Sequence, residues 1–231
     1  MKIKDFFLKS RVFSYSLVLI TAFGITFFTV LNSESFLKVL PLYISLFVML
    51  LNSTANRYGI LIGALNSIFY GVVYLGFGLY GSAVSCFAFS APIQFISFFR
   101  WSKHSYKKTT VFRKLSGKKR ICLILVLTVA YALSAITLKW SGGRYVLLDA
   151  VSIPLGFMNP FLNMFACVEY TYGQLLGTPF TIVIAALMIP TTPAQSAYLV
   201  YHLYSYICII KAFFNVKEIY KEQHADEIGR A

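Results

Sequence analysis

The chain has 231 residues, of which 58% are hydrophobic and 13% are charged. Hydrocarbon accepts apolar side chains on every face of a helix but penalises a charge at mid-depth by about 3 kcal/mol, so this composition excludes an ordinary soluble protein. A net charge of +13 is also typical of nucleic-acid-binding proteins. We interpret the charge instead as that of basic loops, which orient the chain in the membrane and contact anionic lipid headgroups. We therefore expect no nucleic-acid partner.

Eight apolar segments follow one another along the chain, each long enough to enter or cross a bilayer. They predict membrane helices at residues 13–31, 36–51, 58–80, 82–99, 121–138, 146–165, 175–189 and 194–214. The second and seventh segments are short, so we expect both helices to continue into neighbouring polar residues. The predicted fold class is an all-α polytopic membrane protein with eight transmembrane helices.

The basic residues predict the orientation, because Lys and Arg in short loops stay on the cytoplasmic side. Of the 21 basic residues, 18 lie before residue 12, at position 57, within 100–120 or from position 211 onward. With eight spans these segments all fall on one side, and Lys38, Lys139 and Arg144 fall on the other. Both termini are predicted to be cytoplasmic. The first apolar segment lacks a clear cleavage site, so we interpret it as a retained helix.

No sequence pattern indicates a metal or a cofactor. The four Cys residues are scattered without a C-x-x-C pair, and the three His residues are far apart. The chain also lacks the glycine-rich phosphate loop of nucleotide-binding proteins. We therefore predict no cofactor, no metal and no direct use of ATP by this chain.

A short pattern recurs across the basic loop. Tyr58-Gly59-Ile-Leu-Ile-Gly63 is matched 114 residues later by Tyr172-Gly173-Gln-Leu-Leu-Gly177, and the same offset places Phe47 over Phe161. Two three-helix units of equal topology result, joined by a linker helix and preceded by one further helix. Parallel repeats are typical of transporters that bind substrate between the halves, although glycines spaced by four are also common helix-packing contacts.

The repeat divides the chain into six parts. They are a cytoplasmic N-terminus with the first helix, a first three-helix repeat, a basic loop, the linker helix, a second three-helix repeat and a cytoplasmic tail. The corresponding ranges are 1–35, 36–101, 102–120, 121–144, 145–214 and 215–231.

Several short motifs resemble the PnuC-type vitamin transporter family, whose nicotinamide riboside carriers have a SWEET-like 3+1+3 core. They are Gly78-Leu79-Tyr80, Trp101 at the end of the fourth span, Leu148-Asp149-Ala150 and Val168-Glu169-Tyr170. Unlike typical members, this chain has only two Trp residues. The resemblance implies facilitated diffusion, a homotrimer in the bacterial cytoplasmic membrane, and trapping of the vitamin by a separate cytosolic kinase.

Candidate substrate-binding residues are the uncharged polar side chains inside the spans, which must hydrogen-bond to a helix, to water or to a passenger. Most follow helical spacings that place neighbours on one face. They are Asn66, Tyr70, Gln94 and Trp101 in the first repeat, and Asn159, Asn163, Glu169, Tyr172, Tyr198 and Tyr201 in the second. For each Asn, a hydrogen bond to a neighbouring helix is as good an interpretation as contact with a substrate. Asp149 and Glu169 lie near span ends, where surface exposure or pairing with a base is expected.

The leading hypothesis is a carrier for a ring-containing vitamin or nucleoside, with nicotinamide riboside first and thiamine or riboflavin as alternatives. It would work by facilitated diffusion with alternating access. A second hypothesis is the membrane substrate-binding subunit of an ATP-driven vitamin importer. A membrane enzyme or scaffold is a third, but no constellation of acid, base and nucleophile is visible at depth, so we predict that the chain is not an enzyme.

Overall fold

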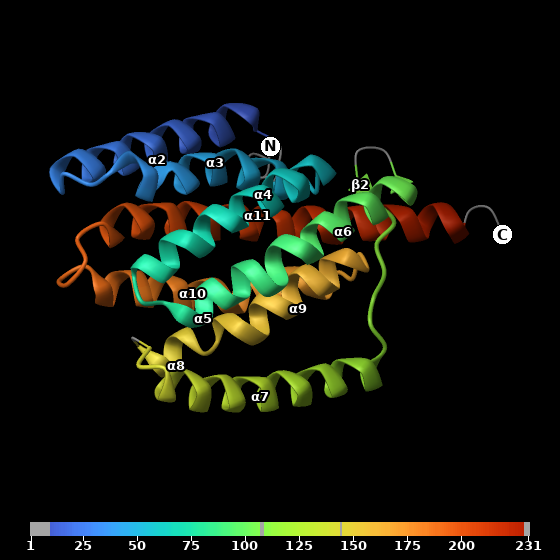
Figure 1. The fold of residues 1–231 in the computed structure, drawn as a ribbon. Helices are drawn as coiled ribbons and strands as arrows, with labels where there is room; N and C mark the ends of the chain where they lie inside the picture. The colour runs from blue at the N-terminus through green and yellow to red at the C-terminus, as the bar shows by residue number, and fades with distance from the viewer. Residues whose placement is uncertain (1–9, 107–108, 144, 229–231) are drawn as a thin grey trace.

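The computed structural model describes residues 10–106, 109–143 and 145–228, and nearly all of them are helical (Figure 1). Eight helical segments are long and apolar enough to cross a membrane in this part of the chain. Six are continuous or nearly so: α2 (Arg11–Leu31), α3 (Phe36–Ser53), α4 (Arg57–Gly76), α7 (Gly117–Trp140), α10 (Glu169–Met188) and α11 (Gln195–Ile228). The predicted all-α polytopic membrane fold is confirmed.

The fourth and sixth spans each consist of shorter pieces. The fourth runs through α5 (Tyr80–Val84), a π-helical segment η1 (Ser85–Ser90) and α6 (Ala91–Lys103). The sixth runs through α8 (Val146–Asp149) and α9 (Ser152–Met164). Strands β1 (Ser105–Tyr106) and β2 (Thr109–Thr110) pair antiparallel after α6.

Two helices extend further than the apolar pattern predicts. Helix α10 begins at Glu169, so its first turns contain the polar residues that precede the apolar segment, as expected for a short span. Helix α11 continues past Phe214 to Ile228 because this amphipathic extension packs into the protein: Val216 is fully buried and Gln223 is 6% exposed.

Six spans form a closed ring. Going round, α3 packs against α4, α4 against α6, α6 against α9, α9 against α10, α10 against α11, and α11 against α3. The other two spans lie outside the ring: α2 packs on α11 and α3, while α7 packs on α5, α8 and α9 at the other edge of the bundle (Figure 1). One leading helix, two three-helix repeats and a linker helix are therefore the observed architecture.

Equivalent turns relate the two repeats and correct the offset for their first helices. After α3, Ala55 has φ +52° and its N–H bonds to the carbonyl of Asn52; after α9, Ala166 has φ +53° and bonds in the same way to Asn163. Asn52 is thus equivalent to Asn163, an offset of 111 rather than the 114 seen at Tyr58 and Tyr172. The pairing of Phe47 with Phe161 is wrong, because three more residues separate Asn163 from Tyr172 than separate Asn52 from Tyr58. One of them lengthens the turn (165–168 against 54–56), and the other two lie in the first turn of α10.

Positions in the bundle are described by its two ends. The basic end carries the connection between α6 and α7 together with the C-terminal turns of α11, and the opposite end carries the connections at residues 32–35, 77–79, 141–143 and 189–194. One buried apolar cluster lies at each end: Leu42, Phe77 and Tyr198 belong to the opposite-end cluster, and Trp101 and Phe112 to the basic-end cluster.

Candidate functional site

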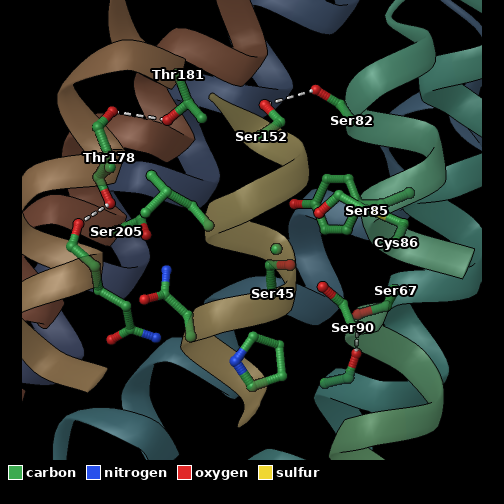
Figure 2. A pocket seen from close by; sticks show the side chains of 18 of the residues that line it. Ser45, Ser67, Ser82, Ser85, Cys86, Ser90, Ser152, Thr178, Thr181 and Ser205 are labelled. Carbon is green, nitrogen blue, oxygen red and sulfur yellow. Dashed lines mark hydrogen bonds between the residues drawn. The ribbon is translucent and has the colours of Figure 1, made fainter. Parts of the chain in front are cut away.

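A cavity of about 340 Å³ lies inside the ring, with all six ring spans contributing to its wall. The side chains point into it from both repeats, with the first repeat on one side and the second on the other (Figure 2). Its lining residues belong to α3, α4, α5–η1–α6, α9, α10 and α11, and no described residue of α2 or α7 is among them. The cavity therefore lies between the repeats, where parallel-repeat transporters bind substrate.

Three predicted residues of the first repeat line this cavity. The Asn66 amide donates to the carbonyl of Pro41 (2.9 Å) and to the hydroxyl of Ser45 (2.7 Å), which leaves its own carbonyl oxygen without a hydrogen-bond partner. Gln94 donates to the Ser67 hydroxyl at 3.2 Å. Tyr70 completes the set; its hydroxyl lies near those of Ser45 and Tyr201 but has no well-formed hydrogen bond.

Two predicted residues of the second repeat, Asn159 and Asn163, line the same cavity from α9. The side-chain carbonyl oxygens of both are buried and have no hydrogen-bond partner. A buried polar atom without a hydrogen-bond partner costs about 1–3 kcal/mol of stability, so such atoms are rare in native proteins and often mark a place where a ligand binds. Amides at these positions are free to bind a ligand that enters the cavity.

Aromatic rings gather in the wall toward the opposite end. The rings of Tyr70 and Tyr74 stack with their centroids 5.6 Å apart, and Tyr201 lies 6.3 Å from Tyr70. All three line the cavity. Sequence analysis predicted Tyr70 and Tyr201 but missed Tyr74, although its position four residues after Tyr70 places it on the same helical face.

Hydroxyl groups are the most numerous polar side chains of the wall, and none of these Ser and Thr residues is among the ten candidates predicted from the sequence. Seven Ser and two Thr residues line the cavity: Ser45, Ser67, Ser82, Ser85, Ser90, Ser152, Thr178, Thr181 and Ser205 (Figure 2). Spacing gives one signal for them, because Gln174, Thr178 and Thr181 follow the i, i+4, i+7 pattern of a single helical face. Asn52, the equivalent of Asn163, was also missed.

The predicted Trp101 lies just beyond the cavity on the basic side. It is 2% exposed and lines a neighbouring cavity of about 20 Å³ that shares Asn52, Asn163 and Gln174 with the main one. Its indole N–H donates to the backbone carbonyl of Asn163 at 2.7 Å. Its ring packs edge-on against Phe112, 5.6 Å away.

The remaining three predicted residues lie away from the cavity. Glu169 accepts from the Arg120 guanidinium (2.7 Å) and from the Leu115 N–H at the basic end, as its position near a span end predicted. Tyr172 is 43% exposed and packs on Phe213. Tyr198 is fully buried between α11 and α3, where its hydroxyl donates to the Lys38 carbonyl at 2.6 Å.

At the opposite end, Asp149 of one quoted motif bonds to the two residues directly after another, Gly78-Leu79-Tyr80. The Asp149 carboxylate accepts from the backbone N–H groups of Gly81 (2.9 Å) and Ser82 (3.1 Å) and from the Ser82 hydroxyl (2.6 Å). A Cβ atom at Gly81 would lie 2.8 Å from the Asp149 carbonyl oxygen, so only glycine fits. Asp149 is fully buried, so the expectation that it reaches the surface or a base is wrong: its partners are the first N–H groups of the fourth span.

Comparison with known proteins matches this architecture. A model of the family described as nicotinamide mononucleotide transporter matches residues 35–216. No curated protein gives a significant match. A solved structure, described as the crystal structure of the vitamin B3 transporter PnuC, superposes with a TM-score of 0.78 at 17% sequence identity, covering 91% of this chain and 93% of the other.

Proposed function

This chain belongs to the nicotinamide mononucleotide transporter family, and we propose that it carries nicotinamide riboside across the membrane by facilitated diffusion. The observation that carries the proposal is the cavity between the repeats, whose described wall consists of amide, hydroxyl, tyrosine and apolar side chains. Alternating access follows if the two repeats rock about this central cavity.

The chemistry of the wall favours a nucleoside over its phosphate. A phosphate carries a charge of about −1.5 to −2 at pH 7, and a buried charge needs a paired cation or many donors to offset its desolvation. The wall's side chains are all uncharged. Ribose hydroxyls and a carboxamide match the free amides of Asn159 and Asn163, and a pyridinium ring matches the faces of Tyr70, Tyr74 and Tyr201.

The same argument supports retention of the product. Once a separate cytosolic kinase adds a phosphate, the nucleotide no longer suits an uncharged cavity and stays in the cell. In this proposal the protein is a homotrimer of the bacterial cytoplasmic membrane with both termini in the cytoplasm, so the basic end faces the cytosol. The 18 of 21 basic residues on that side support the orientation.

Uptake by purified protein in liposomes tests the proposal. Labelled nicotinamide riboside should equilibrate across the membrane and go no further, ion gradients should not change the end point, and nicotinamide mononucleotide should not enter. Asn159→Ala and Asn163→Ala should each weaken binding about fivefold, the effect of one lost hydrogen bond. Asn32→Ala, which removes an exposed amide that contacts the Pro193 carbonyl far from the cavity, is the matched control.

Three results would contradict the proposal. Entry of the mononucleotide as fast as the nucleoside would show that the cavity accepts phosphate. Uptake of thiamine or riboflavin but not nicotinamide riboside would replace the substrate. Tight binding without uptake would favour the substrate-binding subunit of an ATP-driven importer.

A further inference from the structure

The ring of six spans closes through two seams, which are the lines of contact between the repeats. Seam A joins α5–η1–α6 of the first repeat to α8–α9 of the second, and seam B joins α3 of the first repeat to α11 of the second. Each seam pairs the third helix of one repeat with the first helix of the other. Any rocking of the repeats must part both seams at one end of the cavity.

Among the described residues, each seam carries at the basic end one hydrogen bond from a side chain to a backbone carbonyl; seam B has a further one in its middle, from the Tyr204 hydroxyl to the Leu46 carbonyl. In seam A, the Trp101 indole N–H donates to the Asn163 carbonyl at 2.7 Å. In seam B, the Asn215 amide donates to the Ser53 carbonyl at 2.6 Å. The two donors are 114 residues apart, which is the offset of the repeat, and both acceptors lie in the last turn of the first helix of the other repeat.

These two bonds lie at the floor of the substrate cavity. Asn163 lines both the main cavity and the small cavity below it, and Trp101 closes the small cavity toward the basic end. Ala212, one turn before Asn215 on α11, lines the same small cavity. The small cavity therefore extends the main one toward the basic end, beside the first bonded pair and one turn from Asn215 of the second.

The opposite end is held differently. Seam A is closed there by the Asp149 carboxylate, which accepts three hydrogen bonds from the start of the fourth span. Seam B is closed there by the Tyr198 hydroxyl on the Lys38 carbonyl at 2.6 Å. In seam A the bonds to the Asp149 carboxylate are charge-assisted and about twice as strong as the neutral bond of Trp101, whereas in seam B the bond named at each end is neutral.

We propose that Trp101 and Asn215 are paired latches of the basic-end gate, and that transport toward the basic side requires both hydrogen bonds to break. The Asn163 carbonyl also accepts from the Ala166 N–H at 2.9 Å, so it keeps a partner when the indole leaves. Release of that latch therefore leaves no unpaired carbonyl. The proposal rests on alternating access but not on the identity of the substrate.

A native thiol reports on this gate without any substrate. Cys86 lines the cavity, and the other cysteines, Cys122, Cys167 and Cys208, can be replaced by Ser to leave it alone. The measurement is the rate at which a membrane-impermeant methanethiosulfonate modifies Cys86 from each side of oriented vesicles.

Trp101→Phe and Asn215→Ala each remove one donor and should raise the labelling rate from the basic side about fivefold, the shift expected for one neutral hydrogen bond. Tyr198→Phe, which removes the seam B bond at the other end, should raise labelling from the opposite side instead. The matched controls are Trp140→Phe, at an 85% exposed indole, and Asn32→Ala, whose amide contacts a carbonyl outside both seams. Both should leave the two rates unchanged.

The outcomes separate this proposal from the proposed function. If the basic-side rate stays constant in both latch variants, or rises equally from both sides, the latches are not a gate. If the rates shift as expected while liposomes take up no nicotinamide riboside, the gate stands and the substrate is wrong. Because Asn215→Ala and Trp101→Phe act on different seams, misfolding of one variant leaves the other as the test.

Discussion

A single buried carboxylate joins two segments that are far apart in the sequence. Asp149 is fully buried near one membrane surface, yet it has no basic partner in the described residues. Its charge is instead spread over the N–H groups of Gly81 and Ser82 and one hydroxyl, at the positive end of a helical span. Asp149 therefore fixes where the fourth span begins relative to the sixth.

Replacing Asp149 should lower stability. Asp149→Ala leaves two buried N–H groups unpaired, and we expect a loss of about 2–4 kcal/mol in the free energy of unfolding. Asp149→Asn should lose less, because the amide oxygen still accepts one bond. Thermal melting in detergent measures the difference, with Glu34→Gln as control because its ion pair with Lys38 is at the surface and contributes little. Equal melting temperatures for Asp149→Ala and the control would contradict this role.

At the scale of the element, the π-helical segment shapes the fourth span. In an α-helix, residues five apart point in different directions, but i→i+5 hydrogen bonding brings them onto the same side. Ser85 and Ser90 are five apart, and both line the cavity. The segment also keeps Gln94 on the cavity side while Asp149 holds the start of the span. The extra residue per turn thus lets one helix present polar groups along its whole length.

Deleting Ala88, an exposed residue of this segment, should convert it to regular α-helix. The helix content measured by circular dichroism should not change, but the part of the span before the deletion must rotate by about 100° relative to the part after it. Ser85 or Gln94 then turns away from the cavity, and nicotinamide riboside binding should weaken at least tenfold in titration calorimetry. Ala88→Leu at the same position is the control and should bind normally; unchanged affinity in the deletion variant would refute the argument.

The sequence predicted helices better than it predicted the cavity. Apolar runs determine where spans lie, so eight helices and the 3+1+3 order were foreseeable. The π segment was not, because no residue in Ser85–Ser90 differs from ordinary span residues. Six of the ten candidate residues line the cavity, because a polar side chain within a span often faces a binding site. Tyr198 does not line it, because its hydroxyl donates to the Lys38 carbonyl between two helices. Hydroxyl side chains were missed because Ser and Thr can satisfy themselves on their own helix.

At the scale of the whole molecule, the six-helix ring and its two outer helices have different roles. The ring supplies every lining residue among those described, while α7 is mostly exposed and buries only Ser134 and Leu138. An apolar outer helix that crosses once is what returns the chain to the starting side, so that the second repeat can insert in the same direction as the first. Measuring which end of α7 faces the cytoplasm therefore determines the topology of the whole chain.

Two exposed serines at the ends of α7 test that topology. In a cysteine-free background, Ser141→Cys at the opposite end should react with a membrane-impermeant maleimide in intact cells, whereas Ser116→Cys at the basic end should react only after permeabilisation. The reason is that basic loops remain in the cytoplasm. Both positions cap the same helix, so each is the control for the other. A reversed pattern would place the basic end outside.

The three extra residues between Asn163 and Tyr172 carry a consequence for the ancestry of the fold. If the repeats descend from one duplicated unit, this insertion gave only the second copy an edge on which the loop after α6 docks: Arg113 pairs with Ala166 and Val168 through backbone bonds. The first copy, with its shorter turn, has no such edge in the described structure. Duplication supplied two matching seams, and one small insertion made the two halves unequal on the basic side.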